Sequence, residues 1–291
     1  MDVQSKIIPT PGSHPDVKSD ARRVFEVLQS GGVALVPTEV GYGLMVSSTE
    51  AIQKAFTAKK RRPGHAQGVM GSYNLHRELH VLSDEKLEMI RVLHQDLDMS
   101  FGIVAPFRSE HPILQQLTPA TMANTIKDNT LGIYVGGSSL LKELGRLNDE
   151  AGQLMLGSSA NLTGTGQKFR VEDVDAEIKE AADIIVDYGL QRYHVYGGRP
   201  STIIDFENMK VLRVGSSYEL LRERMKKYWG VELPEDPVFD KAELKEVEQK
   251  KEDTQGSQGK DKAANDGLAN IEKKQKSRRR FAVRTLIDWI S

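Results

Sequence analysis

The sequence has no cysteine and few aromatic residues, which make up 6% of its 291 positions. The absence of cysteine excludes disulfides, iron–sulfur clusters, thiolate zinc sites and a cysteine nucleophile. No apolar run approaches the roughly 20 residues that a helix needs to cross a bilayer. The N-terminus carries an early acid, Asp2, and no apolar core, which is unlike a secretory signal. We therefore expect a cytoplasmic protein without a membrane segment.

Charge of neither sign is in excess, because 40 Lys and Arg residues face 41 Asp and Glu residues, a net charge of −1. Any basic site must therefore be local. The G-x-x-x-x-G-K-[ST] phosphate-binding motif is missing, and residues 164–168 lack both its spacing and its final hydroxyl. No G-x-G-x-x-G follows the first predicted strand, which disfavours a dinucleotide site of the usual kind.

Residues 76–80, H-R-E-L-H, place two histidines four positions apart, a spacing that on a helix can hold zinc. Zincin chemistry needs a glutamate directly after the first histidine, whereas Glu78 comes one position later. We interpret His76 and His80 as surface histidines and expect no resident metal.

Composition divides the chain into three parts. Residues 1–17 form an N-terminal extension, residues 18–235 a domain, and residues 236–291 a charged tail. The tail is so poor in apolar residues that burial could not offset the entropy of ordering it, so we expect disorder. Its basic end, residues 276–290, is interpreted as a tail that folds back or frays. The alternatives are a nuclear address, an RNA-phosphate contact and a docking peptide for a partner that the sequence does not identify.

Within the domain, strand and helix patterns are interleaved without strict alternation, which predicts an α/β fold with a twisted, open, mixed sheet and flanking helices. Helical spacing predicts a first helix that is capped by Ser19 and ends at Gly31, and a second that is capped by Ser48 or Thr49. It predicts further helices over residues 84–97, 140–147, 171–182 and 218–229. Apolar runs predict strands over residues 33–36, 42–46, 101–105, 131–135, 153–156, 184–186, 202–206 and 210–214.

Four segments place polar or charged residues beside glycine or proline. Core packing alone does not explain these polar and charged residues. The first is P-T-E-V-G-Y-G-L at residues 37–44, whose glycines let backbone approach a ligand. The second is K-K-R-R-P-G at residues 59–64, whose cations suit a triphosphate. The third is G-S-S-A-N-L-T-G at residues 157–164, and the fourth is P-S-T-I-I-D at residues 200–205 with the later R-V-G at residues 213–215. Arg213 either pairs with Asp205 or contacts an anion.

In this order the segments resemble the YrdC/Sua5 family of threonylcarbamoyl-AMP synthases, with YciO-like features such as Gly64-His65. The family pattern is P-T-E-x-x-Y-G-L, K-x-R-P, S-x-N-x-S-G, S-T-x-x-D and R-x-G, and the resemblance covers residues 18–230. It implies a YrdC-like fold with a concave basic face. It also implies an enzyme that joins bicarbonate to L-threonine and transfers the carbamate to ATP, for modification of tRNA adenosine 37.

The resemblance also implies roles for residues that match the family's motifs. Lys60 and Arg62 would be catalytic and hold the phosphates, and Ser159, Asn161 and Arg213 would complete the nucleotide site. The substrate side would consist of Thr38, Tyr42 and Ser201. ATP is the expected co-substrate, with Mg²⁺ on its triphosphate, although the sequence shows no acidic cage for the metal.

Three departures from the family pattern lie on the amino-acid side. Residues 97–100, L-D-M-S, replace G-P-x-T, and Tyr134 occupies the position of an arginine that is thought to hold the amino acid's carboxylate. After the second motif, residues 64–67 read G-H-A-Q instead of beginning N-P-L. Two alternatives therefore stay open. One is a relative that adenylates another small amino acid's carbamate or another carboxylate, and the other is a non-catalytic module that binds double-stranded RNA or a nucleotide.

Overall fold

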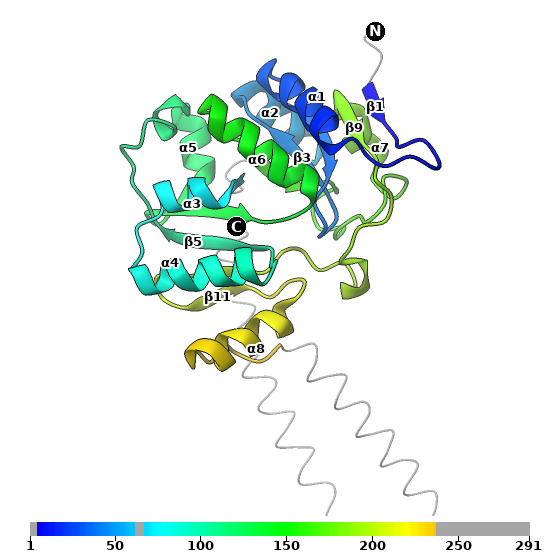
Figure 1. The fold of residues 1–291 in the computed structure, drawn as a ribbon. Helices are drawn as coiled ribbons and strands as arrows, with labels where there is room; N and C mark the ends of the chain where they lie inside the picture. The colour runs from blue at the N-terminus through cyan, green and yellow to red at the C-terminus, as the bar shows by residue number, and fades with distance from the viewer. Residues whose placement is uncertain (1–4, 62–66, 237–291) are drawn as a thin grey trace, which may run out of the picture. The chain divides into compact units, whose positions relative to one another are not determined.

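The computed structural model describes residues 5–61 and 67–236 (Figure 1). This part of the chain divides into two compact units between Ser217 and Tyr218. The second unit holds helix α8 (Tyr218–Trp229), which confirms the helix predicted there. The other elements belong to the first unit. The predicted tail lies almost entirely outside the described residues, and the predicted domain boundaries stay predictions.

The strands of the first unit form one open sheet in the order β1-β9-β2-β3-β8-β4-β7-β5-β10-β11, with β6 paired to β7. Parallel and antiparallel pairs both occur, so the mixed α/β sheet that the sequence predicted is confirmed. The strands are β1 (Ser5–Ile7), β2 (Ala34–Pro37), β3 (Tyr42–Val46), β4 (Gly68–Met70), β5 (Phe101–Pro106), β6 (Ile126–Lys127), β7 (Thr130–Val135), β8 (Leu156–Ser159), β9 (Ile184–Val186), β10 (Ile203–Asp205) and β11 (Lys210–Arg213).

Side-chain caps define where the main helices begin. The Asp16 carboxylate accepts a hydrogen bond from the N–H of Ser19, so the predicted cap at Ser19 is wrong by three residues. Ser48 caps the next helix by accepting from the N–H of Ala51, as expected. The helices are α1 (Val17–Gln29), α2 (Thr49–Ala58), α3 (Tyr73–Leu79), α4 (Asp84–Arg91), the π-helix η1 (Val92–Asp96), the 3₁₀ turn η2 (Leu114–Gln116), α5 (Pro119–Thr125), α6 (Ser139–Ala151), α7 (Ala176–Ala181) and the 3₁₀ turn η3 (His194–Tyr196).

The largest apolar cluster forms where α1 and α6, which lie side by side in Figure 1, pack on the sheet. Their apolar residues recur at helical spacing, so each helix presents one buried stripe. The strands contribute residues that are fully buried, and the cluster includes Val24, Leu28, Ala34, Val36, Met45, Leu140, Leu144, Ile184 and Val186. This packing fixes β2, β3 and β9, which lead to the segments of interest.

Two predicted elements are displaced in the structure. The strand predicted over residues 153–156 instead begins at Leu156 and ends at Ser159. Its polar end is therefore part of the sheet, since Ser159 is opposite Gly43 of β3. The helix predicted over residues 171–182 is confined to α7, Ala176–Ala181.

The prediction of two surface histidines is wrong. His76 and His80 are 0% and 1% exposed, and their Nδ1 atoms lie 2.8 Å apart. Nε2 of His80 lies 3.0 Å from the carbonyl oxygen of Leu131 on β7. Because α3 packs on β7, the apolar surroundings exclude water from both rings. No group of His, Asp and Glu side chains in residues 5–61 and 67–236 is arranged to hold a metal ion.

Within these two described ranges, no helix has the length and apolar character needed to span a membrane.

Candidate functional site

Two adjacent lysines at the end of α2 have opposite environments. Lys59 is 2% exposed, and its Nζ donates to the backbone carbonyl of Ser159 on β8. Lys60 has a left-handed backbone (φ +52), and its ammonium pairs with Glu177 at 3.0 Å on the surface. The turn is held by Thr163, whose N–H and hydroxyl both donate to the carbonyl of Lys59, at 3.2 and 3.0 Å. The structure therefore directs Lys59 inward and Lys60 outward.

The predicted pair, Lys60 and Arg62, follows a K-x-R spacing that also fits Lys59 and Arg61. Arg62 lies outside the described residues, whereas Arg61 is partly buried and stacks over the ring of Phe56 at 5.5 Å. The sequence contained a signal that Lys59, rather than Lys60, faces inward. Lys59 continues the buried face of α2 through Ile52 and Phe56, at spacings of four and three residues.

The third cation of the site is Arg213 on β11. Its Nε donates to the carbonyl of Ser201 and its Nη2 to the Ser201 hydroxyl, each at 2.8 Å. The alternative ion pair with Asp205 does not form, because that carboxylate accepts hydrogen bonds from Asn208 instead. The structure thus joins two predicted site residues, Arg213 and Ser201.

Arg61 repels both of the other cations. Burial, reinforced by the nearby charge of Arg61, lowers the pKa of Lys59 to about 7, although Asp175 opposes this effect. Burial and the same guanidinium lower the pKa of Arg213 to about 10, and burial lowers that of Arg61. Among the described residues, no carboxylate forms an ion pair with Lys59, Arg61 or Arg213. Such an arrangement is unfavourable until an anion binds.

Several buried polar atoms near these cations also lack hydrogen-bond partners in the described part of the chain. They are Nη1 of Arg61, Oε1 of Gln67, the hydroxyls of Tyr134 and Ser158, and Oδ1 of Asn161. Asn161 is 7% exposed and uses only its Nδ2, which donates to the carbonyl of Leu162 at 2.6 Å. An unpartnered buried polar group costs about 1–3 kcal/mol, so these atoms favour a polar ligand.

The two residues predicted in the first motif have their hydroxyls occupied. Thr38 donates to the carbonyl of Gly41 at 2.7 Å and closes the turn between β2 and β3. Tyr42 is fully buried and donates to the carbonyl of Gly189 at 2.9 Å, and burial raises its pKa. Both hold the turn in place, and their contact with substrate stays a prediction.

Gly215, two residues after Arg213, has a steric role that yields a prediction. A Cβ built at this position would lie 2.3–2.4 Å from backbone atoms of residues 200–202. Because backbone cannot yield as a side chain can, Gly215→Ala should destabilise the fold by about 1–3 kcal/mol or more, measured by urea unfolding. Gly145→Ala in α6, where the nearest atoms lie 3.6 Å away, is the matched control and should be neutral or stabilising. Equal stability of the two variants would contradict this explanation.

Comparison with known proteins identifies relatives of most of the first unit. The Sua5_yciO_yrdC family model, described as "Telomere recombination", matches residues 26–215. A protein of Methanocaldococcus jannaschii that is provisionally named threonylcarbamoyl-AMP synthase is 19% identical over 203 residues, which cover 68% of this chain and 87% of the relative.

Solved structures show the same fold. A hypothetical protein of Streptococcus mutans, smu.1377c, is 19% identical with a TM-score of 0.62, covering 79% of this chain and 98% of that one. P. abyssi Sua5, complexed with L-threonine, is 18% identical with a TM-score of 0.59, covering 80% of this chain and 62% of Sua5. Since the family model spans well over half of the sequence, the chain belongs to the Sua5/YciO/YrdC family.

Proposed function

We propose that this protein is an enzyme that binds ATP and uses it to activate a carbamate as an acyl-adenylate. The observation that carries the proposal is the group of three cations, Lys59, Arg61 and Arg213, without a paired carboxylate among the described residues. A polyphosphate would supply the missing negative charge. Ser158 and Asn161, with their unpartnered polar atoms, would then contact the nucleotide beside the phosphates.

The reaction would proceed in two steps. Bicarbonate and a substrate amine lose water to give a carbamate. A carbamate oxygen then attacks the α-phosphorus of ATP, and the bond to the β-phosphate oxygen breaks to release pyrophosphate. Two anions must approach each other in this step, so its main requirements are positioning and neutralisation of charge. Mg²⁺ would enter with the triphosphate, because the described residues provide no carboxylate cage.

L-threonine is the amine that we propose first, because Sua5, which shares the fold, has been crystallised with it. The carbamoyl group would then serve tRNA modification, as the resemblance to threonylcarbamoyl-AMP synthases implies. Tyr134, which replaces the expected arginine, leaves another small amino acid or carboxylate as the alternative substrate.

The test is to incubate the protein with ATP, bicarbonate and a mixture of amino acids, and to identify products by mass spectrometry. We expect an N-carbamoyl-adenylate and pyrophosphate, both dependent on bicarbonate. Product with an amino acid other than threonine would overturn the threonine assignment. RNA binding with no nucleotide turnover would overturn the enzymatic proposal.

Proton uptake gives a second prediction. With its pKa near 7, Lys59 is mostly neutral at pH 8–9, and a bound triphosphate should raise that pKa. ATP binding at pH 8–9, where ATP itself is fully ionised, should therefore take up close to one proton and weaken as pH rises. Calorimetry in buffers of different ionisation enthalpy measures this number. No proton uptake in the unmodified protein would show that Lys59 does not face the phosphates.

A further inference from the structure

The connection between β9 and β10, residues 187–202, passes six strands of the sheet. In the sheet order β9 is second and β10 is ninth, with β2, β3, β8, β4, β7 and β5 between them. We call residues 187–202 the crossing segment. It is held at several points along its length. The carbonyl of Gly189 accepts from the Tyr42 hydroxyl, the N–H of Gln191 donates to the carbonyl of Phe169, and the carbonyl of Pro200 accepts from the N–H of Ser216.

Glu39 fixes the middle of the crossing segment with three contacts. Its N–H donates to Oε1 of Gln191 at 3.0 Å, and its carbonyl accepts from the N–H of Tyr193 at 3.0 Å. Its carboxylate accepts from Arg192 at 3.3 Å. Glu39 has φ +71, a left-handed conformation that is unfavourable for a residue other than glycine. Strain of this kind persists where surrounding contacts enforce it, often at functional sites.

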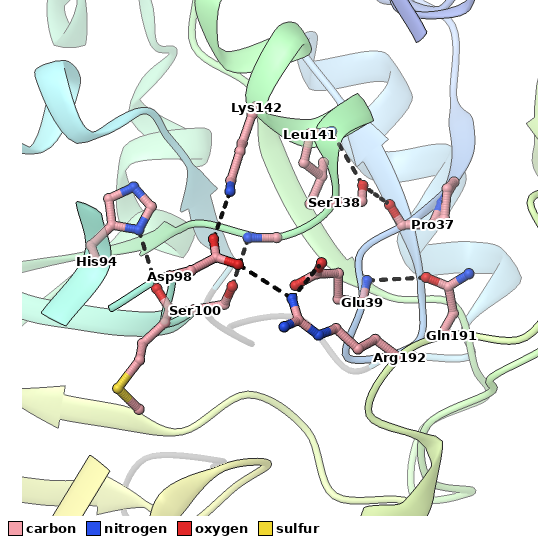
Figure 2. Close-up of polar contacts among 12 residues, drawn as sticks. Pro37, Glu39, His94, Asp98, Ser100, Ser138, Leu141, Lys142, Gln191 and Arg192 are labelled. Carbon is pink, nitrogen blue, oxygen red and sulfur yellow. Dashed lines mark hydrogen bonds and ion pairs between the residues drawn. The ribbon is translucent and has the colours of Figure 1, made fainter. Parts of the chain in front are cut away.

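Arg192 joins the crossing segment to the loop that precedes β5. Figure 2 shows its guanidinium between the carboxylates of Glu39 and Asp98, the latter at 3.4 Å. On its other side Asp98 accepts from Lys142 of α6 at 2.9 Å. Both partners of the Arg192–Asp98 pair are more than half exposed, so the pair contributes little energy and can open readily.

Glycines border this part of the crossing segment. Gly189, Gly197 and Gly198 all have positive φ, and no atom lies within 4 Å of the place where a Cβ would stand. Packing therefore does not require these glycines, whereas the backbone conformation does. They allow the backbone turns that the segment makes on either side of residues 191–193.

The crossing segment touches the ligand site at two places. Its end holds Arg213 through Ser201. Glu39, which holds its middle, and Tyr193 within it act electrostatically on the buried Tyr134, as does Arg213. Tyr134 and Arg213 lie in line across the sheet, because Tyr134 is opposite Gly102, Gly102 is opposite Ile203, and Ile203 is opposite Arg213.

We propose that Glu39 and Arg192 are positioning residues that seat the crossing segment against the ligand site and retain bound nucleotide there. The proposal rests on the proposed function, since it assumes that the three cations bind ATP. Neither residue needs to contact the reacting atoms, because both act through residues 191–193 of the crossing segment.

The first test measures amide hydrogen exchange in the free protein, which reports how firmly Glu39 and Arg192 hold the crossing segment. Arg192→Ala should raise exchange of the amides of Glu39 and Tyr193 by roughly tenfold, because local opening becomes easier. Arg192→Lys, which can still reach one carboxylate, should restore part of the protection. Lys54→Ala removes another partly exposed ion pair, with Asp183 at 2.7 Å, and should leave these amides unchanged. Unchanged exchange in Arg192→Ala would overturn the proposal.

The second measurement is ATP dissociation by stopped flow. Arg192→Ala and Glu39→Gln should each dissociate ATP roughly tenfold faster with little change in association rate, whereas Lys54→Ala should match the unmodified protein. Faster exchange without faster dissociation would show that the crossing segment does not retain nucleotide, and would overturn the proposal. If the unmodified protein binds no ATP, the proposed function fails, and with it the role assigned here, whatever the exchange data show about seating.

Discussion

Replacing Lys59 by methionine should weaken ATP binding by on the order of 100-fold or more, and the free protein should melt at the same temperature or higher. A buried charged group in direct contact with an anion contributes about 2–5 kcal/mol to binding. In the free protein the same group is unfavourable. Its pKa is near 7 when folded against 10.5 ordinarily, so the unfolded chain holds the proton more tightly. Removing it at pH 7 removes a cost on the order of a few kcal/mol.

Lys60→Met is the matched control for this experiment. It replaces the neighbouring lysine, whose ammonium is exposed and paired with Glu177. ATP affinity, measured by calorimetry, should stay within about threefold of the unmodified protein, because an exposed ion pair contributes little. The opposite result, with Lys60→Met losing ATP and Lys59→Met retaining it, would restore the assignment that the sequence motif favoured. A lower melting temperature for Lys59→Met would show that Lys59 serves the fold.

The second large effect is a loss of stability in acid, caused by the buried pair His76 and His80. Burial lowers the pKa of His76 to about 3, with contributions from His80, and burial lowers that of His80 to about 4. The carbonyl of Leu131 can only accept, so Nε2 of His80 carries the proton and Nδ1 of His80 accepts from His76. A further proton on Nδ1 of His80 would break this hydrogen bond, and one on Nε2 of His76 would place a charge at a buried atom without a partner.

Stability decreases in acid because the unfolded state binds protons more tightly than the folded state does. Unfolded histidine binds a proton near pH 6.5, whereas the folded rings stay neutral down to about pH 4 or 3. The contribution of the pair is complete above pH 6.5 and is lost as pH falls through this window. The unfolding free energy should fall by up to about 2.7 kcal/mol per pH unit below 6.5, since two protons are linked to unfolding.

Urea unfolding between pH 7.5 and 4.5 measures this slope. His76→Phe keeps a ring of similar shape that does not titrate, so its slope should be smaller than that of the unmodified protein by up to about 1.4 kcal/mol per pH unit. His14→Gln, at an exposed position, should not change the slope. Equal slopes for all three proteins would contradict the assignment of acid sensitivity to the buried pair.

Much of the fold could be predicted because its signals are local. Buried apolar runs marked strands such as Tyr42–Val46, and helical spacing marked α2 and α8. The end of β8 was misplaced because Ser158 and Ser159 are poor strand formers, and their place in the sheet depends on pairing with β3 and β4. His76 and His80 were misassigned because their burial results from packing on β7, whose Leu131 is 51 residues from His80 along the chain.

The motifs by themselves determined the family, because four short segments in a fixed order are a property of the sequence and were recognisable without coordinates. Only the tertiary structure decided which cations face inward. The K-x-R part of the motif fits the run K-K-R-R in two registers, although the following proline favours Lys60 and Arg62. The inward position of Lys59 depends on the carbonyl of Ser159, which is 100 residues from Lys59 along the chain. The role of Glu39 was decided in the same way, because its three partners at residues 191–193 meet it only through the crossing segment.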